Sequence, residues 1–199
     1  MPDTQVSKRP VVLAIFLIVA GVVGWIAAFA LTVEKFVTLT NPTAPLGCDF
    51  SVLVQCRANL ESWQGSLFGF PNPVIGLAAW IAPLVVGVAI LAGARFARWF
   101  WVLFNLGIVA ALAFVIWLIS QSVFVLGTLC PWCMVTWSVT IPLFWAVTLY
   151  NLREGNIPVP AGVRRVAAAV YGWVPAITLA SYLVVALIAQ VRLDVLGSL

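Results

Sequence analysis

Five long apolar runs dominate the sequence and limit it to a fold that spans a lipid bilayer. We place them at about residues 11–33, 73–92, 99–124, 131–150 and 167–190. About 20 helical residues cross a hydrocarbon core of about 30 Å. The composition agrees, because 8% of the 199 residues are charged, against about 25% in soluble domains. We therefore predict an all-α integral membrane protein with five transmembrane helices in a single membrane domain, residues 1–199.

The placement of the basic residues predicts the orientation of these helices. Loops on the cytoplasmic side of membrane proteins are enriched in Lys and Arg. With a cytoplasmic N-terminus, the inner segments carry Lys8, Arg9, Arg95, Arg98, Arg153, Arg164 and Arg165, and the outer segments carry only Lys35, Arg57 and Arg192. We therefore expect a multi-pass protein of the cell membrane whose N-terminus is cytoplasmic. We expect a monomer, and the net charge of +4 does not indicate a nucleic-acid partner.

Cys130-Pro131-Trp132-Cys133 places two thiols one helical turn apart at the start of the fourth run. A C-x-x-C can be a redox dithiol, part of a zinc site or a haem attachment site. Haem attachment requires a His where Met134 stands, and zinc sites built on two Cys usually recruit further Cys or His. The chain contains no His, so we favour a redox dithiol and expect no metal. Since Pro131 suits the first turn of a helix, we predict that the motif caps the fourth helix, whose positive end lowers thiol pKa values.

The segment 34–72 is the longest piece outside the apolar runs, and it contains Cys48 and Cys56. Loops of this length are usually functional or disordered. Its apolar residues predict a segment that lies against the membrane surface. The predicted orientation places all four cysteines on the extracytoplasmic side, where disulfides persist. From the residues alone, Cys48 and Cys56 either form a static disulfide or take part in redox chemistry.

Two pairs of cysteines on one side of a membrane permit a two-stage electron relay by thiol–disulfide exchange. Exchange passes through a mixed disulfide, so one loop cysteine must reach one cysteine of the C-x-x-C. The loop pair would take electrons from a soluble partner, and the inner pair would pass them to an acceptor in the bilayer. A lipid-soluble quinone suits that role. We expect four helices to form a bundle around its ring beneath Cys133, in a mostly apolar pocket with a few polar groups.

The order of these features resembles the vitamin K epoxide reductase family, and in particular its bacterial members that drive disulfide formation. Two loop cysteines follow the first span, Ser62 and Asn72 come before the second, and the C-x-x-C begins the fourth, over about residues 10–150. The resemblance implies a shuttle disulfide between Cys48 and Cys56 and an active pair at Cys130 and Cys133. It further implies that Cys56 bridges to Cys130 and that Cys133 lies nearest the quinone.

The resemblance also implies which residues contact the quinone, which we expect to be menaquinone or ubiquinone. Asn72 looks like the family's quinone-contacting Asn, and Ser62 falls where the family usually has Ser or Thr. Trp137 stands where vertebrate members have a Tyr that lines the ring pocket, and we add its polar neighbour Thr136.

Many bacterial members carry a fused thioredoxin-like domain after the fifth span. Because this sequence ends at Leu199, the resemblance implies a separate soluble partner. We expect a thioredoxin-fold protein of the DsbA type that meets the membrane protein in trans at Cys48.

The four cysteines allow two other interpretations. A DsbB-type oxidase runs the same relay on another scaffold, but there the C-x-x-C precedes the loop pair. A non-enzymatic membrane scaffold would use its cysteines as structural disulfides, and it has no need of a C-x-x-C at the head of a helix. We therefore predict a quinone-dependent thiol–disulfide oxidoreductase. It would oxidise a soluble partner and drive disulfide-bond formation.

Overall fold

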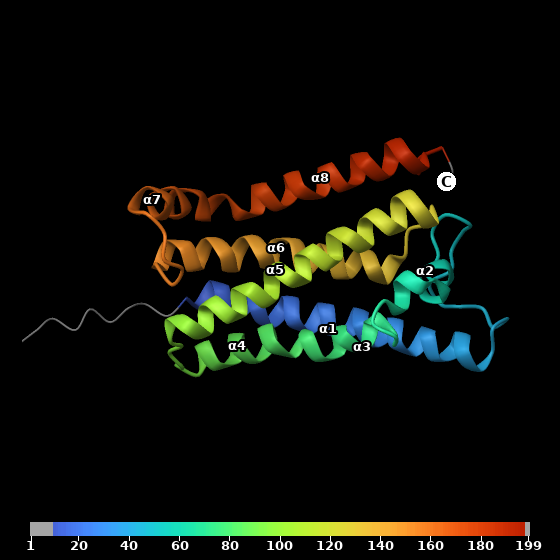
Figure 1. The fold of residues 1–199 in the computed structure, drawn as a ribbon, viewed down its shortest axis with the longest axis horizontal. Coiled ribbons are helices and arrows are strands. Elements are labelled where there is room, and N and C mark those ends of the chain that lie inside the picture. The colour runs from blue at the N-terminus through green and yellow to red at the C-terminus, as the bar shows by residue number, and fades with distance from the viewer. Residues whose placement is uncertain (1–9, 198–199) are drawn as a thin grey trace, which may run out of the picture.

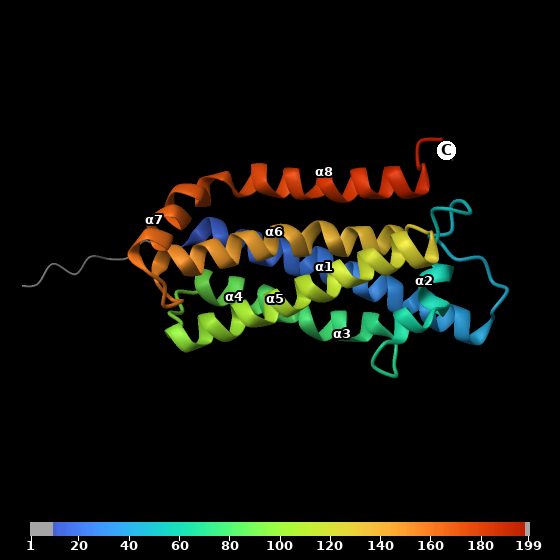
Figure 2. The same cartoon turned by 45° about the horizontal axis from the view of Figure 1, so that its top comes forward.

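The computed structural model describes residues 10–197, which form long helices that run side by side (Figure 1, Figure 2). Five helical stretches are long and apolar enough to cross a membrane: Val11–Thr40, Asn72–Leu91, Arg98–Leu126, Pro131–Glu154 and Ala161–Leu193. Within residues 10–197 the backbone forms no strand beyond an isolated bridge between Val54 and Leu129. The predicted all-α fold with five spans is confirmed. Lys8 and Arg9, which contributed to the predicted orientation, lie outside the described residues.

The chain folds into eight α-helices and three short turns of other helix types within the described range. The α-helices are α1 (Val11–Thr40), α2 (Arg57–Glu61), α3 (Asn72–Ala79), α4 (Ile81–Leu91), α5 (Arg98–Gln121), α6 (Pro131–Glu154), α7 (Ala161–Val170) and α8 (Val174–Leu193). The turns are η1 (Trp63–Ser66), η2 (Ser122–Leu126) and η3 (Tyr171–Trp173).

Two of the five spans are interrupted near a proline. The second span breaks at Trp80, three residues before Pro83, and the fifth breaks at η3, just before Pro175. Proline lacks an amide hydrogen, and its ring clashes with the carbonyl four residues earlier, so the helix cannot continue regularly through that turn. The second span is therefore α3 followed by α4, and the fifth is α7 followed by α8.

Helix α1 packs along α4 and α6, and α5 also packs against α6. Glycines let α1 and α4 approach closely. A Cβ on Gly24 would lie 2.2 Å from the Trp80 ring, and a Cβ on Gly87 would lie 2.6 Å from the carbonyl oxygen of Ala14. Helices α1, α3, α4, α5 and α6 thus form a four-span bundle, and α8 lies against its outside on α6 (Figure 1).

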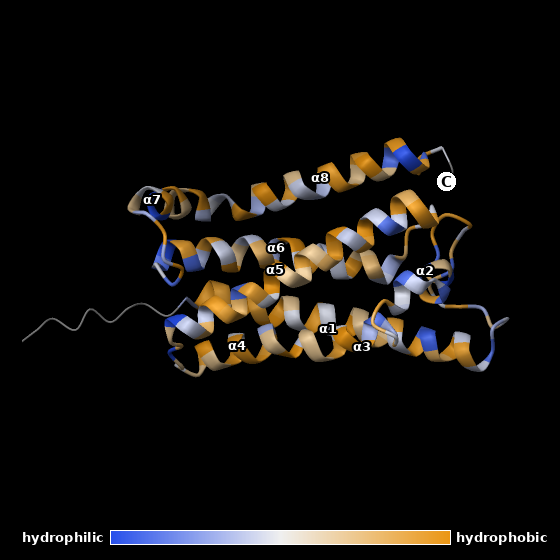
Figure 3. Cartoon of the chain, in the orientation of Figure 1, coloured by the Kyte–Doolittle hydropathy of each residue, from blue (hydrophilic) through white to orange (hydrophobic). Residues whose placement is uncertain are grey.

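The bundle has two chemically different ends (Figure 1, Figure 2). At the cysteine end lie the loop 41–71, the start of α6 and the last turn of α8. At the arginine end lie the α4–α5 turn, the α6–α7 connection and α7. Hydrophobic residues fill the length of the helices, and hydrophilic residues gather toward both ends (Figure 3). This distribution fits helices that cross an apolar layer and expose both ends to water.

Helix α1 is longer than the sequence predicts and extends to Thr40. The extra two turns are more polar than the rest of the helix, and the loop packs against them. The Glu34 carboxylate accepts a hydrogen bond from the Gly47 amide at 3.0 Å, and Lys35 Nζ donates to the Leu60 carbonyl at 2.6 Å. These charged residues end the apolar run but not the helix, because the loop gives them partners.

Helix α8 is attached to α6 at the position that a proline leaves open. Pro142 lies inside α6 and cannot donate to the Ser138 carbonyl. The Tyr182 hydroxyl of α8 donates to that carbonyl instead. A second bond joins Trp145 Nε1 to Ser181 Oγ at 3.3 Å. The fifth span therefore satisfies a backbone group that the proline frees, as apolar surroundings require.

Tyr182→Phe should destabilise the protein in detergent by about 1 kcal/mol, since interhelical hydrogen bonds in membrane proteins contribute roughly 0.6 to 1.7 kcal/mol. Pro142→Ala supplies an amide hydrogen to the same carbonyl, so Tyr182→Phe should cost less in that background. Equilibrium unfolding of the two single variants, the double variant and the parent measures this coupling. An equal cost in both backgrounds would show that the hydroxyl does not serve the proline site.

Candidate active site

The C-x-x-C stands at the head of α6, as predicted. Cys130 is the N-cap, Pro131 is the first helical residue, and Cys130 Sγ accepts a hydrogen bond from the Cys133 amide at 3.4 Å. Before it, η2 ends at Gly127, which takes a left-handed conformation with φ of 66°. Glycine adopts this conformation without steric cost. The sharp turn brings the chain from α5 back to the start of α6.

A short backbone pairing holds the loop against this turn. The Leu129 amide donates to the Leu53 carbonyl at 2.8 Å, and the Gln55 amide donates to the Leu129 carbonyl at 3.1 Å. These two bonds flank Val54, two residues before Cys56, and pair it with Leu129, the residue before Cys130. The pairing therefore sets the distance between the two cysteines.

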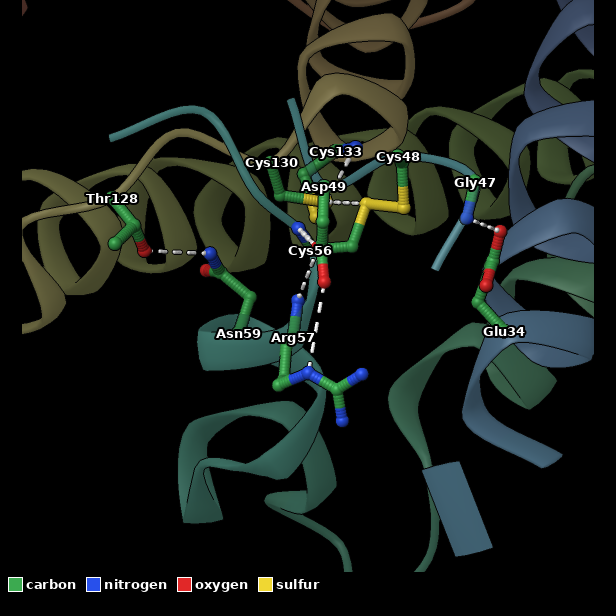
Figure 4. Close-up of a disulfide and its surroundings, with 10 residues drawn as sticks. All are labelled: Glu34, Gly47, Cys48, Asp49, Cys56, Arg57, Asn59, Thr128, Cys130 and Cys133. Carbon is green, nitrogen blue, oxygen red and sulfur yellow. Dashed lines mark hydrogen bonds and ion pairs between the residues drawn. A yellow bond between two sulfur atoms is a disulfide. The ribbon is translucent and has the colours of Figure 1, made fainter. Parts of the chain in front are cut away.

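The loop cysteines Cys48 and Cys56 form a disulfide, and Cys130 and Cys133 are free thiols. Cys130 Sγ lies 3.4 Å from Cys56 Sγ, and the sulfur of Cys56 lies between those of Cys130 and Cys48 (Figure 4). Thiol–disulfide exchange begins with the approach of a thiolate to a disulfide sulfur. The contact thus joins a thiol to the disulfide with which it would exchange.

Cys130 is a favourable participant in such an exchange because its pKa is lowered. The hydrogen bond from the Cys133 side chain contributes most to the lower pKa of Cys130, and the amides of Cys133 and Trp132 add to it. Burial acts in the opposite direction but does not outweigh these bonds. A lowered pKa raises the thiolate fraction and also makes the sulfur a better leaving group.

Asp49 organises the loop around Cys56. A single carboxylate in a loop is ordinarily a solvated charge, but this one is bound to backbone amides. Its Oδ1 accepts hydrogen bonds from the amides of Cys56 at 2.9 Å and Arg57 at 3.2 Å. Its Oδ2 lies 3.6 Å from Arg57 Nε. The carboxylate next to Cys48 therefore holds the start of α2, and with it Cys56.

A segment that we call the strap, residues 41–47, closes over the loop disulfide. The Arg57 guanidinium holds the strap by donating to the carbonyls of Pro42, at 2.6 Å, and Ala44. Leu46 packs on the disulfide. Cys48 and Cys56 are 2% and 0% exposed. The loop disulfide is therefore closed to solvent in this arrangement.

A cavity of about 110 Å³ lies beneath Cys133, between α1, α3, α5 and α6. Of the four predicted quinone contacts, Asn72, Thr136 and Trp137 line it. Its other walls are mainly apolar and include Leu31, Trp80, Val115 and Leu118. Ligand pockets are usually about 300–1,000 Å³. At about 110 Å³ the cavity is smaller than this range.

Ser62 does not line the cavity but supports two residues that do. Its hydroxyl donates to the Asn59 carbonyl at 2.8 Å and accepts from the Gly65 amide at 3.2 Å, and both Asn59 and Gly65 face the cavity. Ser62 therefore caps η1, and its predicted direct contact with a quinone stays a prediction. The Asn72 side chain also holds this turn, because its Nδ2 donates to the Gln64 carbonyl at 2.6 Å.

Asn59 is a cavity residue that the sequence analysis missed. Its Nδ2 donates to Thr128 Oγ1 at 3.1 Å, and its Oδ1 accepts from Ser122 Oγ at 3.2 Å. These partners come from the α5–α6 connection, about sixty residues further along the chain. No spacing or motif in the sequence points to this residue, because its position depends on the docking of α2 against η2.

The cavity fits the chemistry of a quinone ring. Apolar walls suit the ring, and Asn59, Asn72 and Thr136 offer polar groups at its edge, next to the Cys133 thiol. The fold and site together define a multi-pass membrane protein in which a loop disulfide lies against a dithiol at the head of a helix.

The family model that matches this chain is the vitamin K epoxide reductase family, over residues 15–148. The chain belongs to this family. Its members are in general membrane thiol–disulfide oxidoreductases linked to quinones. No curated protein and no solved structure gives a significant match to the chain.

Arg57→Gln should speed the reduction of the Cys48–Cys56 disulfide by a small soluble reductant about tenfold. The variant loses charged hydrogen bonds worth roughly 1.5 kcal/mol or more to the strap carbonyls, so the strap opens more often. The rate is measured by quenching with a thiol-reactive polymer and following the shift on a gel. Glu61→Gln is the matched control, since it breaks the 3.0 Å ion pair with Arg57 but leaves the strap contacts. Equal rates in Arg57→Gln and the parent would show that Arg57 does not hold the strap over the disulfide.

The thiolate of Cys130 should persist to a lower pH than that of an ordinary cysteine. In a background with Cys48→Ala and Cys56→Ala, Cys130 cannot exchange, and its ultraviolet thiolate absorbance can be followed against pH. Cys133→Ala removes the largest cause of the lowered pKa, so the midpoint should rise. Cys133→Ser keeps a hydrogen-bond donor and should titrate at lower pH than Cys133→Ala. Identical curves for the two variants would exclude the side-chain hydrogen bond as the cause.

Proposed function

We propose that this protein oxidises a soluble dithiol protein and passes the electrons through its two cysteine pairs to a membrane quinone, driving disulfide-bond formation. The observation that carries the proposal is the 3.4 Å contact between Cys130 Sγ and Cys56 Sγ of the loop disulfide. Membership of a family of quinone-linked oxidoreductases supports it.

The proposed relay conserves electrons and protons at each step. The partner's dithiol reduces Cys48–Cys56 and leaves as a disulfide, with two thiols in the loop. The Cys56 thiolate then attacks Cys130 of an oxidised Cys130–Cys133 pair, and Cys133 leaves as a thiolate. Finally the Cys48 thiolate attacks Cys56 and displaces Cys130. The lowered pKa of Cys130 favours this last step, because a thiol of lower pKa leaves faster.

The arrangement in the structure corresponds to the end of this sequence, with an oxidised loop and a reduced inner pair. When bound, a quinone supplies the oxidant for the inner dithiol, taking up two electrons and two protons. Asn59, Asn72, Thr136 and Trp137 would hold its ring beside Cys133. The chain offers no His for proton delivery, so the thiols and water at the cysteine end would provide the protons.

We further propose that the cysteine end faces the extracytoplasmic side and that the partner is a thioredoxin-fold protein of the DsbA type acting in trans on a monomer. The excess of arginine at the opposite end supports this orientation. Partner access to Cys48 would require the strap to open, so docking of the partner and displacement of residues 41–47 would be coupled.

The proposed chemistry is favoured over a scaffold with inert disulfides. A static scaffold does not explain why two free thiols lie beside a buried disulfide. It also does not explain why one of them, Cys130, has a lowered pKa. The positions of the pairs, in the loop after α1 and at the head of α6, also differ from the order in DsbB-type proteins.

Two cysteine variants should respond differently to two reductants. Cys48→Ala should fail with a reduced thioredoxin-fold protein yet still reduce quinone with a small dithiol, because the small molecule can reach Cys130 and Cys133 directly. Cys133→Ala should fail with both reductants, because the inner disulfide cannot form. Quinone reduction by the purified protein is followed by absorbance. Normal turnover of Cys133→Ala with either reductant would contradict the proposal, and equal loss in Cys48→Ala with both would make Cys48 structural.

A further inference from the structure

A polar pocket of about 500 Å³ lies at the arginine end. It is formed where the start of α5, the end of α6 and the start of α7 meet, at the end of the bundle opposite α2 (Figure 1). Its lining residues are Arg98, Glu154, Gly155, Asn156, Ile157, Pro158, Val159 and Arg164. The redox chemistry of the cysteine end makes no use of this pocket.

Arg164 is held in place at the pocket wall. Its Nε donates to the Arg153 carbonyl at 2.9 Å, and its guanidinium lies over the backbone of Gly155. A Cβ at Gly155 would stand 3.3 Å from Arg164 Nη1, and Gly155 has a φ of 74°. Glycine at this position thus ends α6 and also leaves room for the guanidinium.

The pocket carries uncompensated positive charge. Glu154 is the one acidic residue in the segments 92–98 and 151–165, and it is paired with Arg153 at 2.9 Å. Among the described residues, the salt bridges involve neither Arg98 nor Arg164. Two guanidiniums without a salt bridge therefore line one pocket, and the carboxylate that also lines it, Glu154, is paired with Arg153. This is a favourable setting for an anion.

Exposed tryptophans place the pocket at the level of lipid headgroups. Trp99 follows Arg98 directly and is 66% exposed, and Trp173, between α7 and α8, is 67% exposed. Exposed tryptophans at the ends of spanning helices mark the membrane interface. Helix α7 presents Arg164 and Arg165 together with exposed Val163 and Val166, as interfacial amphipathic helices do.

We propose that this pocket binds the phosphate group of an anionic phospholipid, with Arg98 and Arg164 as its ligands. Guanidinium groups match phosphate oxygens in two-pronged hydrogen bonds. Basic pockets between transmembrane helices are a known setting for lipid headgroups. The lipid would join α5, α6 and α7, and so connect the fifth span to the four-span bundle on the side away from the cysteines.

The test is the binding of phosphatidylglycerol to the purified full-length protein in detergent, measured by native mass spectrometry over a lipid titration. Arg98→Gln with Arg164→Gln should weaken binding about 30-fold, since each arginine near a lipid surface contributes roughly a fivefold effect. Phosphatidylcholine should bind weakly to both proteins. An excess of inorganic phosphate should displace little phosphatidylglycerol, because it lacks the acyl chains.

The matched control is Arg95→Gln with Arg165→Gln, which removes the same charge from the same end but from outside the pocket. This variant should bind phosphatidylglycerol as the parent does. Equal weakening in the two double variants would overturn the pocket in favour of diffuse charge. Equal binding by all three proteins would exclude any arginine site, and full competition by inorganic phosphate would identify a soluble anion. An intact Cys48–Cys56 disulfide and an unchanged melting temperature without lipid show that the variants fold.

Discussion

The site depends on one contact, the 3.4 Å approach of Cys130 Sγ to Cys56 Sγ. Two backbone hydrogen bonds between Leu129 and the loop residues before Cys56 set this distance. The hydrogen bond from the Cys133 side chain, followed by the amides of Cys133 and Trp132 at the head of α6, then lowers the pKa of Cys130. The four-span bundle matters to the chemistry because it holds a helix head and a docked loop in one place.

Burial both protects this contact and restricts access to it. Cys48, Cys56 and Cys130 are almost fully covered, so the proposed exchange would take place away from water and from unspecific thiols. The same cover would keep the proposed partner from Cys48 until the strap, held by Arg57, moves. Polar contacts suit a segment that has to open, because regions held by few apolar contacts open at low free-energy cost.

The sequence predicts the global features of the fold well and the local features of the site less well. The apolar runs reveal the five spans because membrane helices must be long and apolar, and Pro131 reveals the start of α6. The two polar turns at the end of α1 were missed, because the bonds of Glu34 and Lys35 come from the loop. Asn59 and the strap were missed for the same reason. Their positions depend on tertiary docking between distant segments, which leaves no periodic signal.

The central claim is that Cys130 exchanges with Cys56, and a double variant with Cys48→Ala and Cys133→Ala tests it most directly. In this variant neither Cys48 nor Cys133 is present to resolve a mixed disulfide, so a bridge that diamide forms between the thiols of Cys56 and Cys130 persists. After acid quenching, alkylation and digestion, mass spectrometry identifies the linked peptides. We expect a Cys56–Cys130 bridge within one chain. Alkylation of both Cys56 and Cys130 after the oxidant, or bridges only between two chains, would contradict the claim.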